Sequence, residues 1–142
     1  MNEKSVGGVV FRRERGRILY LILLYERQND EGKRSYWDFP KGHMEEEENE
    51  EQTLRREIHE ETSISDIRVI EGFRETIRYF FSRDGKPVSK EVVFYLCETA
   101  QEKAAVSWEH KDLKWLEYGD AMKALGFDNA KELLKKADRL LA

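Results

Sequence analysis

A nearly continuous apolar run, ILYLILLY at Ile18–Tyr25, restricts the folds that this chain can adopt. A strand with one wet face alternates polar and apolar side chains, so a run without alternation predicts a strand covered on both faces. Other strands are expected at residues 6–11, 67–73, 76–82, 91–98 and 113–117, and helices at 45–62, 120–125 and 129–141. This order predicts an α/β (α+β) fold, a three-layer α/β/α sandwich in which helices cover a mixed sheet.

Two connecting segments carry local signals. Residues 28–35 contain Asn29, Asp30 and Gly32 and are expected to form a polar loop. Pro40 disfavours helix before it, and Gly42 permits an unusual turn after it. No glycine-rich phosphate-binding pattern follows a predicted strand, which argues against dinucleotide-binding and P-loop folds.

Length and charge narrow the class of protein. The 142 residues predict one domain spanning 1–142. The single cysteine, Cys97, lies in an apolar run, so we expect a buried thiol and no internal disulfide. The sequence contains no long apolar stretch or leader-like segment, which predicts a cytoplasmic protein without membrane contact. A net charge of −4 disfavours a stable nucleic-acid complex and means that an anionic substrate would need local cations.

The segment REIHEE at Arg56–Glu61 points to metal chemistry. At about 100° per residue, Glu57, Glu60 and Glu61 fall within an arc of about 100° on a helix. Three carboxylates so close repel one another unless cations neutralise them. Hard divalent ions take oxygen ligands, and Mg²⁺ suits a site shared by carboxylates and phosphates. The competing interpretation is a solvated acidic face, which the run Glu45–Glu48 fits.

The spacing of these residues resembles the Nudix box, G-x5-E-x7-R-E-U-x-E-E-x-G-U, in which U is a bulky apolar residue. The matching positions, within a span of 23, are Gly42, Glu48, Arg56, Glu57, Ile58, Glu60, Glu61 and Ile64. Ser63 departs from the pattern because it stands where the family has glycine. Glycine after a helix often adopts a left-handed backbone, so serine should cost about 1 kcal/mol there without removing a ligand.

The resemblance implies a site for Mg²⁺ (or Mn²⁺) on a loop–helix–loop. It implies that Glu57, Glu60 and Glu61 are metal ligands and catalytic residues. Glu57 is also a candidate general base. Gly42 resembles the position whose backbone carbonyl reaches the metal. Glu48 and Arg56 resemble a structural pair that braces the helix.

Further segments resemble diadenosine tetraphosphate hydrolases over roughly residues 5–140. They are WDFPKGH at 37–43, KEVVFY at 90–95 and SWEHKDLKWL at 107–116. This resemblance implies that Lys41, His43 and Lys90 contact phosphates, since lysine is a compact charge suited to phosphoryl oxygens.

Three other positions matter for the substrate. The resemblance implies that Glu109 is a fourth acid reaching the metal and that Phe94 stacks on a base. Phe94 and Tyr95 alternate on a strand, however, so one of them is expected in the core. Leu113 departs from the relatives, which place there a tyrosine that completes an aromatic clamp. Tyr79 or Phe81 is a possible substitute, although packing on the sheet is the expected role of both.

The predicted function is hydrolysis of a phosphoanhydride bond in a small nucleoside polyphosphate. The leading hypothesis is asymmetric cleavage of diadenosine tetraphosphate to ATP and AMP. Alternative substrates are an oxidised or ordinary nucleoside triphosphate, the 5′ end of an RNA, or a diphosphoinositol phosphate, for which a basic pocket could be supplied by Lys33, Arg34, Arg74 and Arg78. Outside enzymes, the alternative is a nucleotide-sensing binding domain, against which the three box carboxylates argue.

Overall fold

The computed structural model describes the chain except residues 1, 30–31, 102 and 106–111. Its strands are β1 (Asn2–Glu14), β2 (Arg17–Asn29), β3 (Gly32–Asp38), β4 (Lys41–His43), β5 (Arg68–Arg83), β6 (Lys86–Glu98) and β7 (Leu113–Leu116). Its helices are α1 (Glu50–Thr62), α2 (Tyr118–Ala124) and α3 (Asp128–Leu141). Within this described part, the strands form one seven-stranded sheet in the order β3-β2-β1-β6-β5, with β4 added to β1 and β7 to β2.

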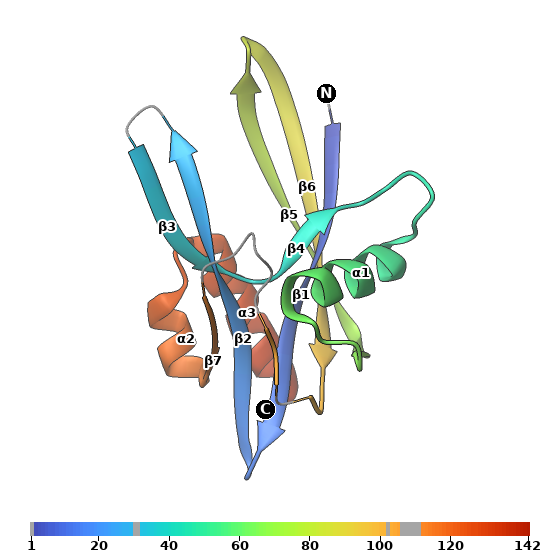
Figure 1. Ribbon diagram of the computed structural model, residues 1–142, viewed down its shortest axis with the longest axis vertical. Coiled ribbons are helices and arrows are strands. Elements are labelled where there is room, and N and C mark those ends of the chain that lie inside the picture. Colours follow the sequence, from blue (N-terminus) through green and yellow to red (C-terminus); the bar gives the residue numbers. More distant parts are fainter. Residues whose placement is uncertain (1, 30–31, 102, 106–111) are drawn as a thin grey trace.

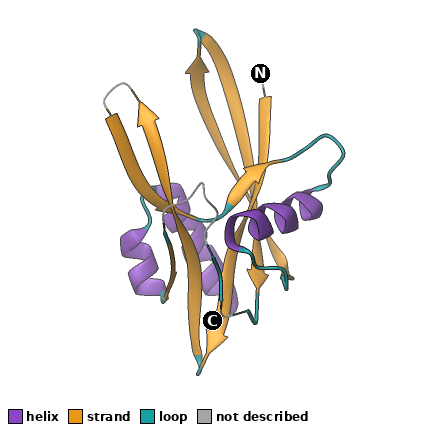
Figure 2. Ribbon diagram, viewed as in Figure 1, coloured by secondary structure: helices purple, strands orange, loops and turns teal. Residues whose placement is uncertain are grey.

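The sheet is mixed, and helices cover both of its faces (Figures 1 and 2). β1 runs parallel to β6 and antiparallel to β2 and β4. α1 contacts β1 and β4, whereas α2 contacts β2 and α3 contacts β5. The predicted α/β/α sandwich is therefore confirmed.

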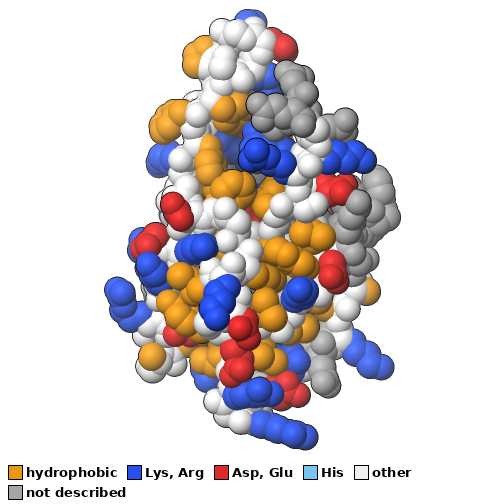
Figure 3. Space-filling model, turned by 90° about the vertical axis from the view of Figure 1, so that its left-hand side faces the viewer, with side chains coloured by type: hydrophobic (Ala, Val, Ile, Leu, Met, Phe, Trp, Pro, Cys, Tyr) orange, Lys and Arg blue, Asp and Glu red, His pale blue; other side chains and the backbone are white. Residues whose placement is uncertain are grey.

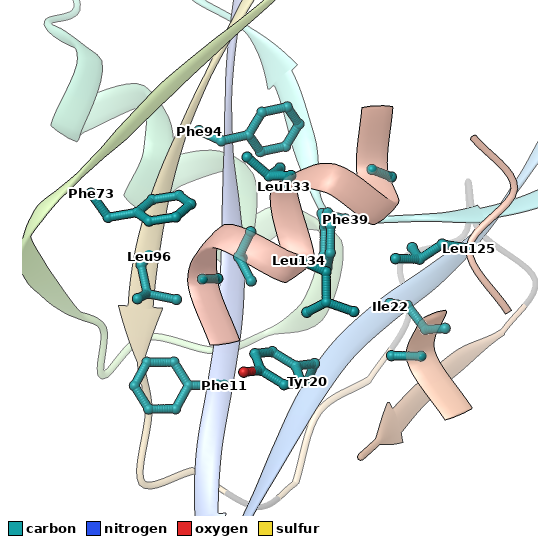
Figure 4. Packing of buried hydrophobic residues seen from close by; sticks show 14 of the residues in the cluster. Phe11, Tyr20, Ile22, Phe39, Phe73, Phe94, Leu96, Leu125, Leu133 and Leu134 are labelled. Atoms are coloured by element: carbon teal, nitrogen blue, oxygen red, sulfur yellow. The ribbon is translucent and has the colours of Figure 1, made fainter. Parts of the chain in front are cut away.

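Strand alternation divides the core into two parts. Val6 and Val10 of β1 belong to the cluster beneath α1, whereas Val9 and Phe11 belong to the cluster beneath α2 and α3. Successive side chains of a strand point to opposite faces, which explains why β1 and β2 are apolar on both sides. Figure 4 shows the second cluster, including Phe73, Phe94, Leu133 and Leu134.

The polar loop predicted at residues 28–35 is wrong. β2 and β3 form a long hairpin in which Tyr25 lies opposite Tyr36 and Arg27 lies opposite Arg34. The hydrogen-bond ladder uses only backbone groups, so strands can continue beyond the core with polar side chains. Polar composition here reflects exposure to solvent and not the loss of strand structure.

Other element boundaries also differ from those predicted from the sequence. The strands predicted at 67–73 and 76–82 are one strand, β5, with a register shift between Val69 and Arg74. Gly72 lies in that irregular stretch with φ 90°, a backbone conformation open to glycine. In α3, Leu133 and Leu134 are buried in the core, whereas Leu140 is 47% exposed.

The helix predicted from residue 45 begins at Glu50 instead. Asn49 is its N-cap: the Asn49 side chain accepts from the Gln52 backbone N–H at 2.8 Å, and the Gln52 side chain accepts from the Asn49 N–H at 2.9 Å. This reciprocal capping satisfies donors that would otherwise lack partners at the helix start. Glu45–Glu48 therefore forms a turn before the helix, which leaves Glu48 free to reach Arg56.

Two predictions about composition can be compared directly with the fold. Cys97 is fully buried, as expected, and burial raises the pKa of its thiol to about 12. Among the described residues, none of the helices combines the length and apolar character needed to cross a membrane.

Candidate active site

Arg56 joins the turn before α1 to the acidic face of the helix. Its Nε and Nη2 donate to the two carboxylate oxygens of Glu48 at 2.6 and 2.8 Å, and Nη2 also donates to the His43 carbonyl at 2.9 Å. These hydrogen bonds to Arg56 lower the pKa of Glu48 to about 2, because they favour the charged carboxylate. Glu48 and Arg56 thus form the bracing contact predicted from the sequence.

Gly42 is required by the close approach of Glu57. A Cβ atom added to Gly42 would lie 1.9 Å from the carboxylate carbon of Glu57 and 2.0 and 2.3 Å from its oxygens. Gly42 pairs with Val6 of β1, so this backbone is held by the sheet and cannot easily retreat. The first residue of the box therefore forms a cradle in which a carboxylate lies against the backbone.

Glu61 is the buried acid of α1, with 5% of its surface exposed. Its Oε1 accepts from the Lys41 backbone N–H at 3.2 Å, and its Oε2 accepts from the Tyr25 hydroxyl at 3.0 Å. A buried charge needs such hydrogen bonds to offset the loss of water. Burial and the charges of Glu61 and Asp38 raise the pKa of Tyr25 well above its ordinary value, so the phenol remains a donor.

Glu57 and Glu60 share Arg56 but differ in exposure. The Glu57 carboxylate, whose side chain is 15% exposed, accepts from Arg56 Nη1 at 2.8 Å. Burial raises the pKa of Glu57, the Arg56 hydrogen bond opposes that rise, and the charges of Glu61 and Glu60 add to it. Glu60 lies 3.3 Å from the same nitrogen, with its side chain 57% exposed. The structure thus brings Glu57 and Glu61 to the site and turns Glu60 outward.

The donor set fits a hard divalent cation. Glu57 and Glu61 supply carboxylate oxygens beside the Gly42 backbone, which are the ligand types that Mg²⁺ prefers. Burial is the main cause of the raised pKa of Glu57, and the charges of Glu61 and Glu60 add to it, a repulsion that a cation would relieve. Within the described residues, no three His, Cys, Asp or Glu side chains lie close enough to enclose an ion. Glu109 falls outside those residues.

These groups line a pocket of about 440 Å³. It brings together predicted site residues from the loop and the helix, namely Lys41, Gly42, His43, Glu57 and Glu61. The same pocket also contains Tyr25, Glu26, Glu45 and Arg56. Positive and negative groups therefore share one concave surface, as a polyphosphate and its counterion require.

The two predicted lysines differ in their surroundings. Lys41 Nζ lies 3.0 Å from the Asp38 carboxylate. Burial alone would lower the pKa of Lys41, but Asp38 raises it above its ordinary value. Lys90 is half-buried on β6 and does not line the pocket, and its pKa is lowered first by burial and then by the nearby Lys41 charge. The two ammonium groups are therefore close enough for the charge of Lys41 to affect the pKa of Lys90.

The structure places Phe94 in the core and not at the surface of the site. Phe94 is 2% exposed and meets Phe39 edge to face, with ring centroids 6.4 Å apart (Figure 4). Its ring also fills the space beside Gly7, where an added Cβ would lie 2.7 Å from Phe94 Cε1. The predicted base contact of Phe94 is not supported, because no ring face is open. The partly buried alternative, Tyr95, binds Glu50 through its hydroxyl.

Sequence reasoning missed two residues of the site. Tyr25 ends the apolar run of β2, and only its place opposite Tyr36 shows which way it points. Asp38 is 4% exposed and accepts from the Phe39 N–H at 2.8 Å as well as from Lys41. Asp38 lies within the WDFPKG segment, and its place three residues before Lys41 could have indicated a partner for that lysine. Nothing in the sequence singles out Tyr25.

Comparison with known proteins decides the family. The NUDIX domain model matches residues 1–137. The chain belongs to the Nudix family. A Nudix protein of Caenorhabditis elegans, the asymmetrical bis(5′-nucleosyl)-tetraphosphatase, is 32% identical over 98% of this chain and 96% of its own length. The mouse protein of the same description is 31% identical over 97% and 95%.

Solved structures agree with this Nudix assignment. The crystal structure of a C. elegans Ap4A hydrolase binary complex superposes with a TM-score of 0.76 at 30% identity, covering 98% of this chain and 97% of that one. A Nudix domain of Shewanella oneidensis complexed with ADP-ribose superposes with a TM-score of 0.75 at 20% identity, which shows a shared fold. The predictions of a Nudix pyrophosphohydrolase and of a resemblance to diadenosine tetraphosphate hydrolases are confirmed.

Proposed function

We propose that this Nudix protein hydrolyses nucleoside polyphosphates and cleaves a dinucleoside tetraphosphate asymmetrically, with diadenosine tetraphosphate giving ATP and AMP. The observation that carries the proposal is the shared pocket, in which Glu57 and Glu61 lie within reach of Lys41 and His43. Relatives at 31–32% identity named as asymmetrical tetraphosphatases support the choice of substrate.

Glu57, Glu61 and the Gly42 carbonyl would hold the Mg²⁺ or Mn²⁺ ion, and Glu60 would join them by a rotamer change of its exposed side chain. When bound, such an ion polarises a phosphoryl oxygen and lowers the pKa of water. Lys41 and His43 bind the phosphate chain and orient it. Tyr25 and the Lys41 N–H hold the Glu61 carboxylate in place.

Glu57 is the proposed base. Glu57 lines the pocket beside the Gly42 backbone, where its carboxylate can accept a proton from the attacking water. The water oxygen forms a bond to one phosphorus, and the bridging oxygen leaves with its electron pair. Glu57 takes the proton and returns it to solvent.

Product analysis tests the function. Wild-type protein with Mg²⁺ is incubated with diadenosine tetraphosphate, ordinary and oxidised nucleoside triphosphates, and 5′-triphosphate RNA. We expect the dinucleotide to turn over fastest and give ATP and AMP in equal amounts. Faster turnover of a triphosphate would show that the protein is a Nudix hydrolase with a different substrate. Nucleotide binding without turnover would favour a sensing domain.

Carboxylate variants test the site. Glu57→Gln and Glu61→Gln should each lower kcat by at least a hundredfold and weaken Mn²⁺ binding in calorimetry. Glu51→Gln is the matched control, because Glu51 is an exposed acid of the same helix and its partner, Arg55, lies 3.8 Å away. Activity within tenfold of wild type for Glu57→Gln and Glu61→Gln would refute the assignment.

A further inference from the structure

A second hollow lies along β3, beside the active-site pocket. It has a volume of about 410 Å³, and its lining includes Arg27, Arg34, Tyr36, Trp37 and Phe127. Pockets of this size accommodate small organic ligands. Figure 3 views the molecule from this side, where Lys and Arg side chains lie beside hydrophobic ones in the upper half of the surface. The function proposed above makes no use of this hollow.

Arg27 and Arg34 give the hollow its charge. They lie directly opposite one another in the β2–β3 ladder, so both side chains project from the same face. Both are exposed, and neither side chain makes a hydrogen bond or ion pair with any described residue. Like charges directly opposite destabilise a sheet, and an anion bound between them would remove that penalty. Arginine also binds phosphate in a two-pronged geometry that lysine cannot reproduce.

Aromatic rings continue the same face toward the active site. Tyr36 stacks on Tyr25, with centroids 5.5 Å apart and an interplanar angle of 11°. Phe127 meets the other side of Tyr36 edge-on at 5.0 Å and is itself 42% exposed. Such rings offer apolar surface to a nucleobase, since every base has a face that can stack.

The hollow and the active-site pocket are adjacent through Tyr25 and Tyr36. Tyr25 lines the pocket and donates to Glu61, while its stacked partner Tyr36 lines the hollow. Burial raises the pKa of Tyr36, the Lys41 charge lowers it, the Asp38 charge raises it and the Arg27 charge lowers it, so charges from both the pocket and the hollow act on the Tyr36 hydroxyl. Arg27 is two residues beyond Tyr25, about 7 Å along the strand. A polyphosphate chain can span that separation.

The other basic residues considered from the sequence are not gathered here. Arg74 donates to Glu50 at 2.8 and 2.9 Å, and Arg78 lies 3.3 Å from Glu91. Lys33 lies next to Arg34 in β3, so its side chain projects from the opposite face. The unneutralised arginine pair is therefore distinct from the basic pocket that a diphosphoinositol phosphate would need.

We propose that Arg27, Arg34 and Tyr36 form a second subsite, which holds the nucleotide unit of the substrate that lies farther from the acidic cluster. The two guanidinium groups bind a phosphate of that unit, and Tyr36 with Phe127 contacts its base. This inference rests on the proposed function and deepens it. A dinucleoside polyphosphate has such a second unit and a nucleoside triphosphate does not, so the subsite selects the dinucleotide.

The test compares an Arg27→Gln, Arg34→Gln double variant with Lys33→Gln. Lys33→Gln removes the same kind of charge from the same hairpin but from the opposite face. Kinetics are measured with diadenosine tetraphosphate and with ATP, and calorimetry measures binding of a methylene-bridged, uncleavable diadenosine tetraphosphate. Because charge-assisted hydrogen bonds are among the stronger ones, we expect the double variant to raise KM and Kd for the dinucleotides about tenfold or more. KM for ATP should change less than twofold, and Lys33→Gln should alter neither substrate.

The outcomes separate this subsite from the function on which it rests. If wild-type protein cleaves the dinucleotide and the double variant behaves like Lys33→Gln, the subsite is refuted and the proposed function stands. An equal rise in KM for both substrates would indicate a long-range electrostatic effect of the lost charges, and it would also refute the subsite. Wild-type protein that leaves the dinucleotide intact overturns the function and the subsite together. Partial recovery in an Arg27→Lys, Arg34→Lys variant would support direct phosphate contact.

Discussion

Replacing Ser63 with glycine should stabilise the fold without disturbing the acidic cluster. Ser63 ends α1 with φ 64° and ψ 10°, in the left-handed region. That conformation costs a residue with a side chain about 1–2 kcal/mol, and glycine adopts it freely. Glycine also makes the unfolded chain more flexible, which offsets about 0.4–1 kcal/mol. The expected net gain in the free energy of unfolding is about 0.5–1 kcal/mol.

Urea unfolding followed by circular dichroism measures this gain. With a slope of about 2 kcal/mol per molar urea, the midpoint should rise by about 0.3–0.5 M. Ser63→Ala is the matched control, because it removes the hydroxyl but keeps the strained backbone. The Ser63 N–H donates to the His59 carbonyl at 2.8 Å, and its carbonyl accepts from Gln101 at 3.2 Å. Both bonds use backbone atoms of Ser63 and survive in either variant.

The comparison of the two variants decides the reasoning. Ser63→Ala should unfold within about 0.2 M of wild type, and Ser63→Gly should exceed both. If glycine gives no gain, the helix end is not strained in the way that its backbone angles indicate. If alanine gives the same gain as glycine, the serine hydroxyl is the source of the effect.

Three further perturbations have defined outcomes. Gly42→Ala must displace the Glu57 carboxylate, so kcat should fall at least a hundredfold with Tm nearly unchanged; retention of activity would contradict the steric argument. Glu48→Gln should unfold at lower urea than wild type at pH 6. Because Arg56 lowers the pKa of Glu48 to about 2 from an ordinary 4.5, that difference is complete above pH 4.5 and should vanish as pH falls toward 2. Cys97 should react with a thiol reagent at pH 8 only when urea unfolds the protein, and rapid labelling of the folded chain would contradict its burial.

The sequence was informative where side-chain periodicity and fixed spacing acted together. The apolar run of β2 predicted a covered strand, and the sheet does lie between helices. The box spacing predicted that Glu57 and Glu61 share a helix face near Gly42, and all three line one pocket. Left-handed geometry at Ser63 followed from its place after the helix. In each case a local rule of backbone geometry determined the outcome.

The sequence was uninformative where tertiary register decides. Whether Phe94 or Tyr95 faces the core depends on the alignment of β6 with β1, where Phe94 pairs with Gly7. The space that Gly7 leaves is filled by the Phe94 ring. The hairpin that places Arg27 opposite Arg34 likewise reads as a loop by composition. Long-range pairing sets these features, and no local propensity records it.

Net charge describes the molecule as a whole and hides the local arrangement of charges that matters. A chain at −4 does not attract polyanions as a whole. Much of the acidity near α1 is already neutralised, because Glu48 binds Arg56 and Glu50 binds Lys4 and Arg74. Glu57 and Glu61 line the pocket beside Lys41 and His43, whereas Arg27 and Arg34 of the hairpin line the neighbouring hollow. An acidic protein can in this way hold a polyphosphate together with its metal, because the pocket carboxylates meet the cation while the pocket lysine and the hairpin arginines meet the phosphates.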